Sequence, residues 1–336
     1  MLRAKFAADD KKHRKLEEFA NLNVYTIDIV VKEYYHSIIK AIGEEKTMVL
    51  PIILFVLATV PAVVLFIMTR KLDKKEKESK KLLFKIVLME IPFLIATVIA
   101  EGVLQALMTA VSGEDMSNLV YIALFCFLVV GPAEEIFKFL GAKIPTWKSP
   151  EFNCKFDGIV YCTTSALTFA LVENLGYVFT SGSLGTAIMR ALCCFPGHFM
   201  YGVLMGVFYS RARVCANNGD KKGKNKNFFL AILIPALIHG LYDTICFSMS
   251  PLATELDSAG GFYETAVVLQ LILLLGAFVV VIVGTYICLF VVIIKQSKND
   301  KFIAPRYPLP QQPAAVQQAP AQPVAPQADP YGNNNV

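Results

Sequence analysis

The sequence predicts an all-helical, polytopic membrane protein with about seven transmembrane helices around an intramembrane polar cavity. Three observations support this fold class. The 336-residue chain is 55% hydrophobic with a mean hydropathy of +0.52, and its apolar residues gather into runs long enough to cross a bilayer. Groups of polar and ionisable residues stand inside the four runs between 119 and 250. Helices are expected because each satisfies its backbone polar groups within one segment.

Seven apolar runs define the domain organisation. We expect spans at about 48–68, 83–111, 119–142, 157–181, 185–209, 228–250 and 264–294. Together they form one transmembrane domain, 48–296. Residues 1–47 are predicted to be a charged amphipathic arm. Residues 297–336 form a Pro/Gln/Ala-rich tail, predicted to be disordered and able to offer a polyproline segment to a partner.

The distribution of basic residues predicts the orientation in a cell membrane. Lys and Arg crowd 70–81, 143–155 and 211–226 and follow the last span, whereas 112–118, 182–184 and 251–263 contain none. The positive-inside rule therefore places the basic loops and the C-terminus in the cytoplasm. Seven crossings then put residues 1–47 outside, although they hold nine Lys/Arg against eight Asp/Glu.

Two explanations of that conflict stay open. The favoured one is that a nearly neutral N-terminal segment is translocated, because the rule is strongest for short loops beside span ends. The other is that the first apolar run, which contains Pro51 and Pro61, is bent or re-entrant and does not cross.

Composition also narrows the function classes. The eight cysteines lie mostly inside the spans and include no C-x-x-C pair, so they read as small apolar residues rather than disulfides or a zinc knuckle. We expect the bilayer as the surrounding partner and no nucleic acid.

Polar residues inside four spans are the strongest functional signal. One centrally placed charge costs about 2.5–3.5 kcal/mol on the insertion scale. Five charged residues would together cost roughly 12–18 kcal/mol unless they pair or share a water-filled cavity: Glu134, Glu135, Lys138, Glu173 and Asp243. Residues three or four apart face the same way on a helix, so four helices can direct these groups to one interior. The positions are Glu134, Glu135 and Lys138; Glu173 and Asn174; Arg190 and His198; and His239 and Asp243.

This combination suits hydrolysis. A catalytic zinc takes three N/O ligands and an open position for water, which His198, His239 and one carboxylate could supply. A glutamate would then take the proton of the water, and Lys138 or Asn174 would stabilise the oxyanion. A metal-free scheme, in which Glu134 or Glu135 activates water directly, stays open.

Structural roles compete with these assignments at single positions. The Glu134–Lys138 pair could simply neutralise charge, and either histidine alone could be a packing residue. Glu90 and Glu101 are expected to be structural or cavity-lining, and Arg190 to be a partner for a carboxylate. The stripe His198, Gly202 and Gly206 predicts close approach of a neighbouring helix.

Three motifs resemble those of the PrsW-type intramembrane proteases. Glu134-Glu135-Ile-Phe-Lys138 is similar to the family's E-E-x-x-K, Phe169-Ala-Leu-Val-Glu173 to F-x-x-x-E, and His239-Gly-Leu-Tyr-Asp243 to H-x-x-x-D. The resemblance covers about 119–250, which is therefore the expected catalytic core, and the three motifs occur in order on separate spans. The family is related to the CPBP proteins and the type II CAAX prenyl proteases.

The resemblance implies a helix bundle around a polar cavity and hydrolysis of peptide bonds in membrane-anchored, single-span substrates such as anti-sigma factors. It gives Glu134 and Glu135 the water-activating and ligand roles. Glu173 assists, and with His198 and His239 it forms the expected metal set; zinc is provisional. Asp243 and Asn174 complete the expected catalytic group.

Two other functions remain as alternatives. An ion- or proton-coupled transporter could use the same buried carboxylates and histidines as a relay. A catalytically inactive relative could serve as a membrane scaffold, although it would be expected to have lost at least one motif residue.

Overall fold

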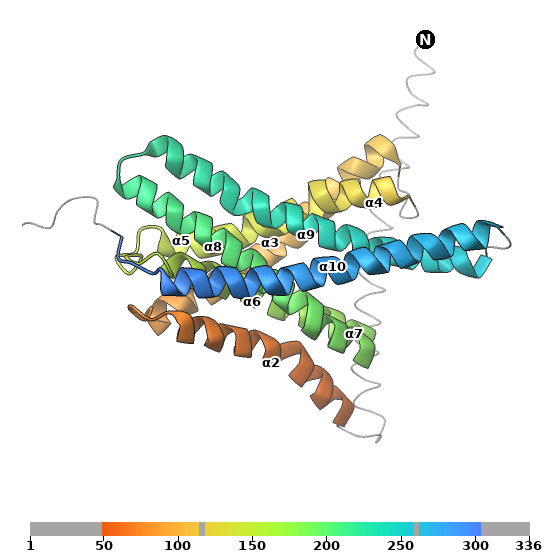
Figure 1. Cartoon of the computed structure of the whole chain (residues 1–336), viewed down its shortest axis with the longest axis horizontal. Coiled ribbons are helices and arrows are strands. Elements are labelled where there is room, and N and C mark those ends of the chain that lie inside the picture. The colour runs from red at the N-terminus through yellow and green to blue at the C-terminus, as the bar shows by residue number, and fades with distance from the viewer. Residues whose placement is uncertain (1–48, 114–117, 259–261, 304–336) are drawn as a thin grey trace, which may run out of the picture.

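Seven long apolar helices make up the protein in the computed structural model, which describes residues 49–113, 118–258 and 262–303 (Figure 1). The described residues contain no named strand, only an isolated bridge between Cys154 and Phe302. The predicted fold class is confirmed. The helices are α2 (Val49–Leu72), α3 (Lys80–Ser112), α4 (Leu119–Phe125), the π-helical η1 (Cys126–Val130), α5 (Gly131–Thr146), α6 (Asp157–Ser181), α7 (Leu184–Met189), the π-helical η2 (Arg190–Cys194), α8 (Phe195–Asn217), α9 (Lys221–Ser258) and α10 (Phe262–Lys298).

Several helices extend beyond the predicted spans because hydropathy marks only the apolar part of a helix. α3 begins at Lys80, after Ser79 accepts a hydrogen bond from the Leu82 amide as its N-cap. α9 begins at Lys221 rather than near 228. α2 is one continuous helix that contains Pro61 and is long enough to cross, which supports seven crossings.

Two parts of the predicted organisation lie outside the described residues: the amphipathic arm and nearly all of the Pro/Gln/Ala-rich tail. Their roles therefore stay predictions. All eight cysteines are free, as expected.

The predicted glycine stripe on α8 is confirmed as a close helix contact. A Cβ at Gly206 would lie 2.4 Å from the Cα of Ile159 and 2.6 Å from the carbonyl oxygen of Gly158, both on α6. A Cβ at Gly202 would lie 3.0 Å from the Cα of Thr163. Real Cβ atoms do not approach backbone so closely, so these glycines let α6 and α8 meet backbone to backbone.

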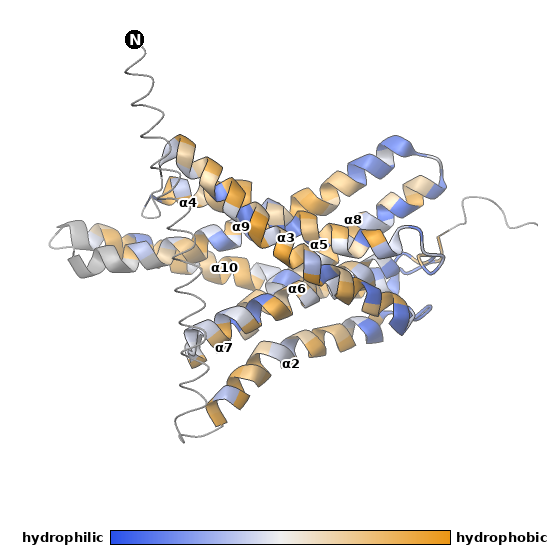
Figure 2. Ribbon diagram, turned by 180° about the vertical axis from the view of Figure 1, so that it is seen from behind, coloured by the Kyte–Doolittle hydropathy of each residue, from blue (hydrophilic) through white to orange (hydrophobic). Residues whose placement is uncertain are grey.

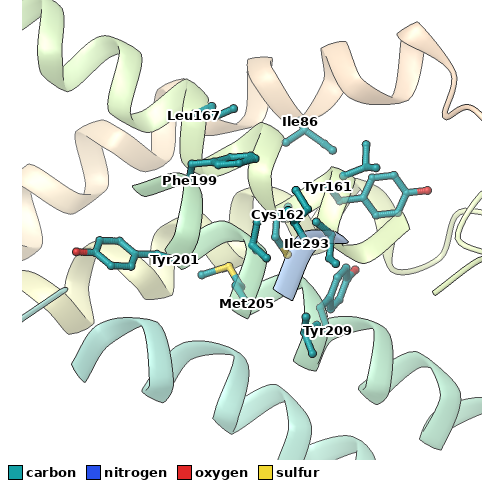
Figure 3. Close-up of a cluster of buried hydrophobic side chains, with 14 of the residues drawn as sticks. Ile86, Tyr161, Cys162, Leu167, Phe199, Tyr201, Met205, Tyr209 and Ile293 are labelled. Carbon is teal, nitrogen blue, oxygen red and sulfur yellow. The ribbon is translucent and has the colours of Figure 1, made fainter. Parts of the chain in front are cut away.

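A large apolar core surrounds that contact. Figure 3 shows side chains of this core packed together, among them Ile86, Leu167 and Phe199. Fully buried Tyr161 and Cys162 come from α6, Met205 and Tyr209 from α8, and Ile293 from α10. This core fixes the two helices that carry Glu173 and His198.

The outside of the bundle is apolar, as a lipid-facing surface should be. Large exposed side chains include Val280 and Leu273 of α10 and Val98 of α3. Hydrophilic residues concentrate at the end of the bundle that holds the α8–α9 connection (Figure 2). We call this the basic end, because the loops 70–81, 143–155 and 211–226 carry the excess of Lys and Arg.

Candidate active site

Two π-helical turns place the first site residues, and a proline explains each turn. Pro132 and Pro196 lack an N–H and crowd the carbonyl four residues earlier, which belongs to Leu128 in η1 and to Leu192 in η2. Each helix widens into a π turn that accommodates its proline. The freed carbonyl oxygen of Leu192 instead accepts a hydrogen bond of 2.7 Å from the Tyr286 hydroxyl of α10.

Both turns lead directly into a site residue. Glu134 stands two positions after Pro132, and His198 two positions after Pro196. π-Bulges occur frequently at functional sites because they redirect the side chains beside them. The sequence signal was Pro-x-Glu and Pro-x-His inside an apolar run, which sequence reasoning did not use.

Lys138 is the centre of the polar cluster and is fully buried. Its ammonium lies 2.8 Å from Glu134 Oε2, 2.8 Å from Glu135 Oε1 and 3.0 Å from His198 Nδ1, and 4.4 Å from the centre of the Phe169 ring. An ammonium can only donate hydrogen bonds. Nδ1 of His198 therefore accepts, and the proton of this neutral ring is on Nε2.

Glu135 orients the second histidine. His239 Nδ1 lies 3.0 Å from Glu135 Oε1, so it donates to that carboxylate. Nε2 of His239, which carries the lone pair when the ring is neutral, lies 3.8 Å from Glu134 Oε2 and 3.3 Å from Asp243 Oδ2. A carboxylate behind a histidine in this way is the usual arrangement for fixing a metal ligand.

Glu173 links His198 to Arg190 on the other side of the site. Its Oε2 lies 3.1 Å from His198 Nε2, and its Oε1 lies 2.8 Å from Arg190 Nη2. Arg190 also donates from Nε to the Asn174 side-chain oxygen and lies 4.0 Å over the Tyr177 ring. The expectation that Arg190 partners a carboxylate is confirmed.

One group in the described part of the chain has the spacing of metal ligands. Glu134, His198 and His239 each offer an atom, and these atoms all lie within 4.8 Å of one another. The predicted metal set contained Glu173 in place of Glu134. The geometry groups Glu134 with both histidines, while Glu173 contacts His198 from outside that group.

A cavity of about 260 Å³ gives access to this group, and it separates the predicted residues into two sets. Glu134, Glu173, His198, His239 and Asp243 line it. Glu135, Lys138 and Asn174 are fully buried and do not. Neither Lys138 nor Asn174 therefore reaches the cavity as an oxyanion-stabilising group would need to do.

The two glutamates of α3 lie in different surroundings. Glu101 lines the cavity, as one of the two expectations for it stated. Glu90 is buried elsewhere and accepts a hydrogen bond from Ser165. Its carboxylate approaches α5 closely, since a Cβ at Gly141 would lie 1.9 Å from Glu90 Oε2.

Sequence reasoning missed the aromatic residues of the cavity. Tyr201 stacks on His239 with ring centres 4.8 Å apart, and Tyr242 and Tyr177 line the walls. The signal available for Tyr201 was its position three residues after His198, on the same face of α8.

The donor set fits a catalytic metal. Two imidazoles and one carboxylate are the protein ligands of several catalytic zinc sites, and Glu135 provides the outer contact that such a histidine needs. His239 would bind a metal through Nε2 in its neutral form, and His198 Nε2 would have to release its proton to serve as a ligand.

Comparisons with known proteins find a family model and several relatives that match this chain. The model of the "PrsW family intramembrane metalloprotease" matches residues 78–283. "Protease PrsW" of Clostridioides difficile is 31% identical over 195 residues, which are 57% of this chain and 78% of that protein. The Bacillus subtilis protein of the same name is 35% identical over 124 residues, 37% of this chain and 55% of the relative. No solved structure matches.

The matched region begins just before α3 and ends within α10, so it includes every residue of the cavity. Seven apolar helices and the buried Glu/His/His group both agree with a multi-pass membrane enzyme. This chain belongs to the PrsW family of intramembrane metalloproteases.

Proposed function

We propose that the protein hydrolyses peptide bonds of membrane-anchored, single-span proteins with water activated at Glu134, between His198 and His239. One observation carries this proposal: in a chain of a protease family, a carboxylate and two imidazoles from three helices meet within 4.8 Å on a cavity inside the bundle. Geometry of this kind suits a hydrolytic water and its proton acceptor.

Glu134 is our candidate for the residue that acts on water, because it lines the cavity and Glu135 does not. Its neighbour Glu135 acts behind the site, where it orients His239 through Nδ1. Lys138 holds both carboxylates in place through ion pairs of 2.8 Å. A proton taken by Glu134 can be returned to the leaving amine in the second half of the reaction.

Glu134, His198 and His239 would hold the metal that the family name implies, and zinc suits these ligands. Bound there, a metal ion would lower the pKa of water and polarise the peptide carbonyl. In this case Asp243, 3.3 Å from His239 Nε2, is our candidate among the cavity carboxylates for the proton acceptor. The metal-free scheme assigns that role to Glu134.

The proposed substrate class is a regulatory protein with a single membrane span, such as an anti-sigma factor. The proposed orientation follows the positive-inside rule, with the basic end in the cytoplasm. Reporter fusions to the α6–α7 and α8–α9 connections would test it: the first should report the outside and the second the cytoplasm.

The test compares Glu134→Gln with Glu135→Gln in the full chain purified in detergent. With single-span peptides as substrates, Glu134→Gln should lower kcat about 10²–10⁴-fold, while Glu135→Gln should lower it about 10–100-fold as a residue that acts through His239. Equal activity of parent and Glu134→Gln would refute the assignment.

Metal analysis of the parent protein and of His239→Ala separates the two schemes. One zinc per chain, lost in His239→Ala, supports the metal site. Absence of stoichiometric metal, together with activity that chelators do not change, supports water activation by Glu134 alone.

A further inference from the structure

A second site lies at the basic end of the bundle, away from the catalytic cavity. It is a groove of about 400 Å³ between the start of α3 and the connection from α5 to α6. Lys81 and Lys85, one turn apart on α3, form one wall, and Lys148 stands in the other. None of these residues takes part in the proposed reaction.

The groove has a strong local excess of positive charge. Its single lining carboxylate, Glu151, accepts hydrogen bonds from the Ser79 amide at 2.8 Å and the Ser79 hydroxyl at 2.9 Å. Within the described residues, no carboxylate lies within ion-pair distance of the ammonium groups of Lys81, Lys85 or Lys148. Three cations therefore face a space that holds one already hydrogen-bonded acid.

The surface beside the groove is apolar and faces outward. Phe84 and Leu88 follow Lys81 and Lys85 on α3 and are 60% and 50% exposed. Ile144 of α5, close to the opposite wall in sequence, is 54% exposed. Because these residues continue from the lysines toward the apolar part of the bundle, a ligand with an anionic head and hydrocarbon chains can satisfy both surfaces.

We propose that this groove binds the phosphate-bearing headgroup of an anionic phospholipid, with the acyl chains along Phe84 and Leu88. Basic pockets between transmembrane helices near the cytoplasmic surface bind such headgroups. The apolar strip favours a lipid over free phosphate, which could use only the lysines. This site is independent of the catalytic proposal.

The experiment measures lipid binding, not proteolysis. The full chain in phosphatidylcholine nanodiscs is titrated with phosphatidylglycerol, and bound lipid is counted by native mass spectrometry. The Lys81→Gln/Lys85→Gln/Lys148→Gln variant should bind phosphatidylglycerol at least about tenfold more weakly than the parent, because each surface lysine contributes to attraction. Lys148→Gln alone should show a smaller loss and serves if the triple variant does not fold.

The matched control removes the same charge elsewhere. Lys221→Gln/Lys222→Gln/Lys226→Gln, on the exposed start of α9, should leave binding within twofold of the parent. Equal losses in both triple variants, or no preference for phosphatidylglycerol over phosphatidylcholine, would overturn the proposal. Inorganic phosphate that displaces the lipid at equal concentration would overturn the lipid assignment in favour of a simple anion site.

Discussion

At the scale of single residues, Lys138 determines the electrostatics of the site. It is a fully buried cation with two carboxylates at 2.8 Å and an imidazole nitrogen at 3.0 Å. A buried ion pair often contributes little net stability, but removing one partner leaves an uncompensated charge and costs about 3–5 kcal/mol. The Glu134–Lys138 pair therefore does more than neutralise charge, because it also holds a residue of the proposed catalytic group in place.

Lys138→Met should strongly destabilise the protein for this reason. Its thermal unfolding midpoint in detergent should fall by many degrees, consistent with a loss of about 3–5 kcal/mol. Adding Glu134→Gln and Glu135→Gln to Lys138→Met should restore much of the stability without restoring activity, because all three charges are then absent. A Lys138→Met protein as stable as the parent would contradict this account.

Arg190 lines the cavity and forms an ion pair with Glu173, and we expect it to act through that residue. Arg190→Ala should lower kcat about 10–100-fold with little change in KM, because Glu173 loses the ion pair that holds it beside His198. Arg190→Lys keeps a cation and should recover part of the loss. Arg211→Ala, at an exposed position on α8, is the control and should leave both constants unchanged. A change in KM alone would point instead to substrate contact.

At the scale of elements, helix contacts align the four polar helices. α6 and α8 meet at Gly158, Gly202 and Gly206, and α5 meets α9 at Gly131, where a Cβ would lie 2.7 Å from the Ala236 carbonyl oxygen. Such close approach leaves little room for adjustment. The distance between His198 and Glu173 therefore depends on glycines that lie about one and two turns along α8 from His198.

Gly206→Ala should expose that dependence. The added Cβ would meet backbone, which cannot rotate aside, so we expect a loss of about 1–3 kcal/mol and a fall in activity as α8 moves away from α6. The control is Gly276→Ala on α10, where no atom lies within 4 Å of the added Cβ and alanine should be neutral or mildly stabilising. Equal midpoints for the two variants in thermal unfolding would show that the contact is not tight.

At the scale of the whole molecule, buried acids join distant segments at the basic end. Glu78, in the connection from α2 to α3, accepts a hydrogen bond from Tyr161 of α6. Asp300, after α10, accepts one from the Phe156 amide before α6. Burial raises the pKa of Glu78 from 4.5 to about 7 and that of Asp73 from 3.8 to about 6.

These raised pKa values predict greater stability in mild acid. Between pH 4 and 7 the folded protein retains protons that the unfolded chain releases, so this contribution is present in full below pH 4 and is lost as the pH rises through 6 and 7. The unfolding midpoint should therefore fall between pH 5 and pH 8. Glu78→Gln, which stays neutral, should remove much of that fall; an unchanged pH profile would contradict the assignment.

The sequence by itself determined the seven helices and the polar positions of the site. The length and hydropathy of an apolar run can be read directly from the sequence, and bilayer thickness sets the length that a spanning run must have. The cost of a charge in the membrane made the glutamates, Lys138, His239 and Asp243 conspicuous before any contact was known. The motif order then predicted a protease of the PrsW type, which the family match confirms.

Only the tertiary structure decided which of those residues line the cavity and which are buried behind it. Glu134 and Glu135 are adjacent in sequence but about 100° apart around the helix, so one lines the cavity and the other is buried behind it. The π turns, the Glu173–Arg190 pair and the Tyr201–His239 stack all depend on contacts between helices. Helical spacing indicates which residues share a face, but the packing of other helices against that face determines what the residues contact.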